Sequence, residues 1–150
     1  MRVLRRCVFV VGLVALLLQA SPHAVGTVTV TTTTLSDLRA WKYSLAWVSD
    51  AAGNVNTNLQ TFRAGNLVQI KYIPDGGGTA PTALYDIVLN DPNGVDFLGG
   101  GGANLSATVS TTVPVAVPLL YDGTITLDLV VTNAGVSKGG TVILWFQQSQ

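Results

Sequence analysis

The chain has 150 residues, of which 48% are apolar and only 11% are charged, with eight basic and eight acidic side chains. All eight acidic residues are Asp. A chain this apolar is not intrinsically disordered, and the absence of Glu argues against a helical bundle. The length is that of one domain.

Residues 1–24 have the pattern of a secretory signal. Three arginines within the first six residues precede an apolar run from Cys7 to Leu18, and small residues follow this run. Such a segment is typically removed on export, and the run is shorter than the roughly 20 apolar residues that cross a bilayer. The alternative is an apolar arm that packs on a neighbouring subunit. In either case we expect a single domain over residues 25–150.

The composition of residues 25–150 excludes several kinds of chemistry. This body has five basic residues and eight Asp, which leaves a net charge of −3. Because affinity for nucleic acid rests on Lys and Arg contacts to phosphates, nucleic acid is not an expected partner. Cys7 and His23 both precede the body. Disulfides, thiolate zinc sites, Cys nucleophiles and His-based triads are therefore excluded, and we expect no cofactor and no catalytic residue.

Alternation of apolar and polar side chains with a period of two dominates the body. It is clearest over residues 41–47 and 125–131 and recurs over 142–146, where both faces are apolar, while 67–73 and 83–90 have the length of strands. This pattern predicts half-buried β-strands. The predicted core consists of Trp41, Tyr43, Leu45, Trp47, Val68, Ile70, Tyr72, Tyr85, Ile87, Leu89, Ile125, Leu127, Leu129, Val142, Leu144 and Phe146.

Two segments have the features of sheet edges. The Thr- and Val-rich run from Thr27 to Leu35 predicts an edge strand or an extended arm, and Pro114 and Pro118 make residues 113–120 an edge or crossing segment. Turn residues such as Asp, Asn and Gly separate the runs at regular intervals. Seven to nine short strands with this spacing predict an all-β fold, an antiparallel two-sheet sandwich of the immunoglobulin-like or jelly-roll type.

Candidate ligand-binding residues are few. Asp91, Asn93 and Asp96 offer oxygen ligands for Ca²⁺, but they lack the Gly and terminal Glu of a helix-loop-helix site, so an ordinary turn is the favoured interpretation. Glycine runs at 76–78 and 99–102 could cradle an anion. No Lys-Ser/Thr pair follows them, so we expect flexible connectors.

Sugar chemistry is a further possibility. A pair of Asp could cleave a glycosidic bond only if one of them had a raised pKa in an apolar pocket, and most Asp here fall in turns where water keeps them ionised. Trp41 or Trp145, if exposed, could stack on a sugar ring, although core packing is the favoured interpretation. Asn104-Leu105-Ser106 matches the short glycosylation pattern.

A series of passages occurs in a recognisable order over roughly residues 40–146. They are Ser49–Val55, Pro74–Pro81, Tyr85–Leu89, Gly94–Leu98, Gly102–Ser106, Asn133–Gly135 and Gly140–Val142. In this order they resemble small β-rich virion proteins of tailed bacteriophages. The resemblance implies a non-enzymatic structural component of a capsid, neck or tail that is located in the virion. The Asp-Ala-Ala-Gly-Asn turn is also similar to turns of bacterial immunoglobulin-like surface repeats, so an exported surface or adhesion module is the alternative.

A particle component would dock on its neighbours through a low-charge surface and free strand edges. Thr27–Leu35 and Val142–Phe146 are the expected edges. We expect the Thr-rich segment to reach an adjacent chain and to form a closed cyclic homo-oligomer, with a trimer favoured and other virion proteins as further partners. The body is not expected to contact a membrane.

Overall fold

The computed structural model describes residues 26–35, 39–59 and 62–148, so the signal-like segment 1–24 lies outside the described residues. None of the described helical turns is long and apolar enough to cross a membrane. The elements in chain order are β1 (Thr27–Leu35), β2 (Ala40–Val48), β3 (Val55–Leu59), β4 (Gly65–Pro74), the short 3-10 turn η2 (Gly77–Thr79), β5 (Asp86–Asn90), β6 (Thr111–Tyr121), β7 (Leu127–Thr132) and β8 (Gly139–Gln147).

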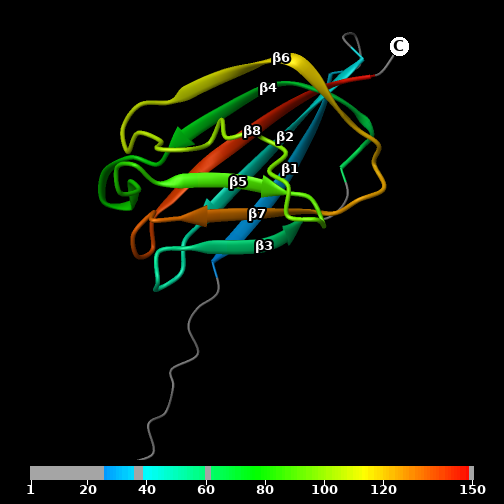
Figure 1. Cartoon of the computed structure of the whole chain (residues 1–150). Coiled ribbons are helices and arrows are strands. Elements are labelled where there is room, and N and C mark those ends of the chain that lie inside the picture. The colour runs from blue at the N-terminus through cyan, green and yellow to red at the C-terminus, as the bar shows by residue number, and fades with distance from the viewer. Residues whose placement is uncertain (1–25, 36–38, 60–61, 149–150) are drawn as a thin grey trace, which may run out of the picture.

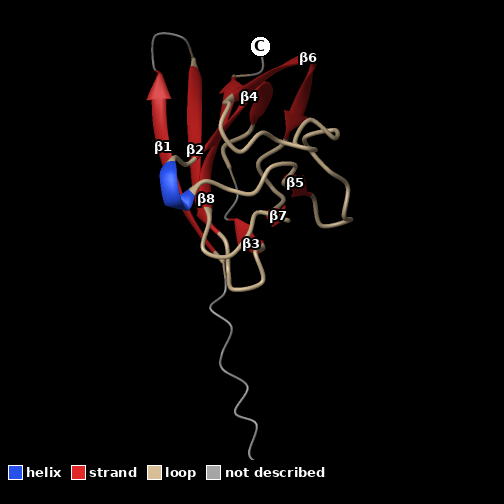
Figure 2. Ribbon diagram, turned by 90° about the vertical axis from the view of Figure 1, so that its left-hand side faces the viewer, coloured by secondary structure: helices blue, strands red, loops and turns tan. Residues whose placement is uncertain are grey.

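The strands form two antiparallel sheets that pack face to face. The larger sheet has the order β1-β2-β8-β4-β6 and the smaller has the order β3-β7-β5 (Figure 1). In Figure 2, β1 and β2 stand at the left of the molecule and the smaller sheet lies to their right. The predicted all-β sandwich is therefore confirmed.

The strand order distinguishes the two expected kinds of sandwich. From β2 to β8, each strand lies in the opposite sheet from the strand before it. The segment 96–105, which connects β5 to β6, hydrogen-bonds to the outer edge of β5 and takes the place of a fourth strand in the smaller sheet. With this segment counted, the order is that of a jelly roll with β1 added at one side. An immunoglobulin sandwich instead keeps several consecutive strands paired within one sheet.

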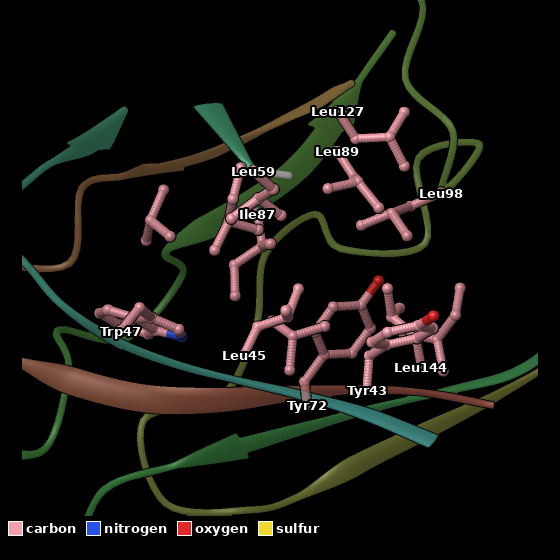
Figure 3. Close-up of a cluster of buried hydrophobic side chains, with 14 of the residues drawn as sticks. Tyr43, Leu45, Trp47, Leu59, Tyr72, Ile87, Leu89, Leu98, Leu127 and Leu144 are labelled. Carbon is pink, nitrogen blue, oxygen red and sulfur yellow. The ribbon is translucent and has the colours of Figure 1, made fainter. Parts of the chain in front are cut away.

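The core lies between the sheets and follows the predicted alternation. Tyr43, Leu45, Tyr72 and Leu144 project from the larger sheet toward side chains of the smaller sheet, such as Leu127 (Figure 3). Fully burying a side chain of this kind contributes about 1.5–3 kcal/mol, so the alternation accounts for most of the driving force for folding.

Two predicted core residues, Val68 and Ile125, are only half-buried. A bulge in β4 between Leu67 and Gln69 shifts the register with both neighbouring strands, so Leu67 and Ile70 point inward and Val68 does not. Ile125 precedes β7 and packs against the margin of the core.

The expectation that Val142–Phe146 lies at an edge is wrong. β8 is a central strand that pairs with β2 on one side and β4 on the other. Its second apolar face accounts for this position, because Trp145 lies between Lys42 of β2 and Gln69 of β4, whose alkyl stems can cover the indole ring.

Candidate assembly surface

The two sheets together have four edges, formed by β1 and β6 in the larger sheet and by β3 and β5 in the smaller sheet. An edge strand presents unpaired N–H and C=O groups at alternate residues, and these groups can pair with another chain. Whether an edge is open depends on what covers it.

The edge of β5 is closed by the segment 96–105. Backbone and carboxylate groups of this segment form hydrogen bonds with the outward-facing N–H and C=O groups of β5 and of Tyr85, the residue before β5. The bonds join Ile87 N–H to Gly102 O (2.8 Å), Leu89 N–H to Asp96 Oδ1 (3.1 Å), Phe97 N–H to Leu89 O (2.7 Å) and Leu105 N–H to Tyr85 O (2.8 Å). No second chain can pair with β5 while this segment is in place.

The edges of β6 and β3 are restricted in other ways. β6 is the last strand in the order of the larger sheet, which confirms the predicted edge position of this segment. Pro114 and Pro118 fall within β6 and supply no N–H, which weakens it as a template for pairing. β3 has only five residues and borders the start of β1. There Thr57 Oγ1 donates a hydrogen bond to Gly26 O at 3.4 Å, so β3 faces a strand of its own chain.

The edge of β1 is open over its whole length. β1 pairs in unbroken register with β2, from Thr27 opposite Val48 to Leu35 opposite Ala40, and no strand among the described residues pairs with its other side. Its nine residues include no charge and no proline. β1 therefore has no charge, proline or bulge, which are three of the devices that usually protect an edge. The predicted edge position of Thr27–Leu35 is confirmed.

A groove of about 420 Å³ lies between β1 and β3, next to the open edge. Its walls are Val28, Val30 and Thr32 of β1 and Thr57, Asn58 and Leu59 of β3, with Tyr43 and Phe62 completing the lining. The three β1 residues lie opposite Trp47, Leu45 and Tyr43 of β2, whose side chains are buried, so they point to the inner side of the sheet. Val30 nevertheless remains 42% exposed, because it lines this groove and is not packed in the core.

Two tyrosines fix the loop at one end of the groove. Tyr43 Oη accepts the Arg63 N–H at 2.7 Å, and Tyr121 Oη accepts the Phe62 N–H at 3.2 Å and donates to Ile125 O. The Phe62 ring packs 4.5 Å from the Tyr43 ring, measured between centroids. Burial raises the pKa of Tyr121, so its hydroxyl remains a donor to a higher pH than that of an exposed tyrosine. These contacts hold Phe62 and Arg63 against β2 and β6.

A smaller hollow of about 240 Å³ lies near the other end of β1 and includes Arg39, Trp41 and Arg63 in its lining. The Arg63 guanidinium carbon stands 4.8 Å from the Trp41 ring centroid, a cation–π contact. Trp41 itself is only 3% exposed, so the idea that it stacks on a sugar ring is wrong. Trp145 is half-buried on the outer face of the larger sheet.

The three candidate calcium ligands shape two consecutive turns. Asp91 Oδ1 accepts the N–H groups of Asn93 (2.8 Å) and Val95 (2.9 Å), and these bonds lower the pKa of Asp91. Asp96 Oδ1 accepts from Leu89 and Leu98, and its Oδ2 accepts from Gly100 at 2.8 Å. Asn93 Nδ2 donates to Asp91 Oδ2 at 3.3 Å, whereas Asp96 accepts hydrogen bonds from β5 and from the segment 96–105. Among the described residues, no three His, Cys, Asp or Glu side chains gather as metal ligands would.

The glycine run 99–102 is more than the flexible connector that we expected. A Cβ atom at Gly102 would lie 2.1 Å from Ile87 O, so only glycine allows this segment to reach β5. The other run, 76–78, has open space at each Cβ position, but Gly77 and Gly78 belong to the 3-10 turn η2, and Lys138 Nζ donates to Gly78 O at 2.7 Å. Asn104 of the glycosylation pattern is exposed, and its N–H donates to Asp86 Oδ1 at 2.7 Å.

Comparisons of the chain with protein-family models, with curated proteins and with solved structures found no match.

Proposed function

We propose that this protein is a non-enzymatic structural component of a bacteriophage virion and that it acts through contacts between subunits. The observation that carries the proposal is the open edge of β1, which stands beside a groove of mixed polar and apolar lining, while segment 96–105 closes the β5 edge. A long uncharged edge is an aggregation hazard in a free monomer, so its presence fits a surface that is covered in an assembly.

The fold adds support by analogy. Jelly rolls form viral capsid domains, although the same architecture also occurs in lectins and cupins, so the fold does not by itself assign a function. Together with the ordered passages of sequence that resemble tailed-phage virion proteins, it favours a particle component. An apolar core that runs through both sheets would give such a component the rigidity that it needs.

An exported surface or adhesion module is the second candidate, and the signal-like residues 1–24 are the observation that favours it. The turn at Asp50–Asn54 of this chain is similar to turns of immunoglobulin-like repeats, but the strand order of the chain differs from that of such repeats. The two candidates predict different locations: the virion for the first, and the cell surface or medium after signal cleavage for the second.

Mass spectrometry of cell fractions separates these candidates. Particles purified from lysates of cells that carry the gene are compared with the envelope and the culture medium of the same cells. We expect peptides from residues 40–146 to be enriched in the particles. Their absence from particles, combined with a mature N-terminus at Ser21 or Val25 in the envelope or medium, would overturn the virion proposal in favour of the exported module.

A further inference from the structure

We propose that β1 pairs with β1 of a second copy of this chain, antiparallel and across a two-fold axis, so that two larger sheets join into one continuous sheet. The inference rests on the proposed function, because it identifies the partner of the assembly edge. In Figure 2, β1 stands at the outer side of the molecule, where a second strand can approach it.

Among the strands that the structure describes, β1 alone has an edge that is neither closed nor interrupted, so it is the edge that a second copy offers. Segment 96–105 closes β5, two prolines interrupt β6, and β3 faces its own β1 across the groove. A ring, such as the trimer predicted from the sequence, would need β1 to meet a different edge of its neighbour. Pairing of β1 with β1 uses the same surface on both copies, so it closes after two subunits.

The sequence of β1 is compatible with pairing to itself. Antiparallel pairing over all nine residues places Thr31 opposite Thr31 of the second copy, on the two-fold axis. Thr27 then lies opposite Leu35, and Val30 opposite Thr32. Like charges directly opposite each other would destabilise a sheet, but β1 carries none. Its Thr and Val residues are those that strands favour, so the pairing costs little in conformational preference.

The groove provides a second reason for this arrangement. Val28, Val30 and Thr32 point to the inner side of the sheet, and the same residues of a second copy would extend that inner face beyond β1. The valine side chains of the second copy would then lie next to the groove, whose lining includes Leu59 and Phe62. Val30, which is 42% exposed in the single chain, would be covered.

Cysteine cross-linking in the full chain tests the register. In a Cys7→Ser background, Thr31→Cys places two thiols opposite each other, with Cβ atoms about 5 Å apart. Thr33→Cys is the matched control, because Thr33 lies on the same exposed outer face of β1. In the proposed register, the two Thr33 positions are four residues out of step, roughly 13 Å apart. We expect mild oxidation to give a covalent dimer with Thr31→Cys and none with Thr33→Cys. Cross-linking at neither position, or equally at both, would overturn the proposal.

Charge substitution provides an independent measurement in solution. Thr31→Lys and Thr31→Glu should each sediment as monomers, and an equimolar mixture of the two should recover the dimer mass. Thr108→Lys, at an exposed loop position away from β1, is the control and should dimerise like the unaltered chain. A monomeric unaltered chain at all concentrations would overturn the β1 pairing and leave the virion proposal intact, because the particle location is measured separately.

Discussion

Gly102→Ala should detach the segment 96–105 from β5. The new Cβ atom would lie 2.1 Å from Ile87 O, whereas real contacts of this kind are at least 3.0 Å, so the segment must move by roughly 1 Å. That movement breaks the 2.8 Å bond from Ile87 N–H to Gly102 O. A buried donor left without its partner costs about 1–3 kcal/mol, and weaker packing of Leu98 and Leu105 brings the expected loss to about 2–4 kcal/mol.

Thermal unfolding followed by circular dichroism measures this loss. For a domain of this size, about 1 kcal/mol corresponds to a Tm change of roughly 3–5 °C, so we expect Tm to fall by roughly 10 °C. The opened β5 edge should also make the variant aggregate more readily at high concentration. Gly76→Ala is the control, because Gly76 has an extended backbone and no atom within 4 Å of its Cβ position. A Tm for Gly102→Ala within about 2 °C of that control would refute the role assigned to the segment.

Three further predictions concern the stability of the sandwich. Ser49→Ala removes a buried hydroxyl that accepts the Lys138 N–H at 2.9 Å. This substitution should lower the free energy of unfolding in urea by about 1–3 kcal/mol, and an unchanged urea midpoint would contradict the prediction. Burial and the nearby Asp75 charge raise the pKa of Tyr85 from 10.0 to about 12, so the stability that its neutral form contributes is complete below pH 10 and is lost as the pH rises toward 12. Tyr85→Phe should therefore lose less stability than the unaltered chain when unfolding is compared across that pH range, and an equal loss in both would contradict this prediction. Phe146→Ala should lower the free energy of unfolding, measured by guanidinium titration, by about 3–5 kcal/mol, because Phe146 is fully buried among four aromatic rings. A loss below about 1 kcal/mol would show that this cluster does not hold the sheets together.

The alternation of side chains predicted the central strands and most of the core because the period of a strand is a local property of the chain. Chain-local features also predicted the edge positions of β1 and β6, from threonine content and from proline. The bulge that excludes Val68 from the core could not be predicted in this way, since it is set by the pairing of β4 with β6 and β8 together. The central position of β8 likewise depends on which strands flank it, although its two apolar faces were a signal that we did not use.

The candidate surface was predicted only in part. The sequence indicated the free edge of β1, but the groove beside it depends on β3 standing opposite β1, which is a property of the sheet order. Phe62, Leu98 and Leu105 are buried although they lie outside the main strands, where no periodicity marks them. A large apolar side chain isolated in a polar loop was the available signal. The closure of β5 rests on Gly102, whose role appears only once the two backbones are seen in contact.

The central position of β8 has a consequence for synthesis on the ribosome. β2 and β4 are both made early, yet each lacks a partner on the side that faces β8 until β8, the last described strand, has emerged. Ala40 pairs with Gln147, so the larger sheet closes only after a long stretch of chain has been translated. A nascent chain therefore exposes two unpaired strand edges for most of its synthesis, and a chain that is cut before β8 keeps both of them exposed to other chains.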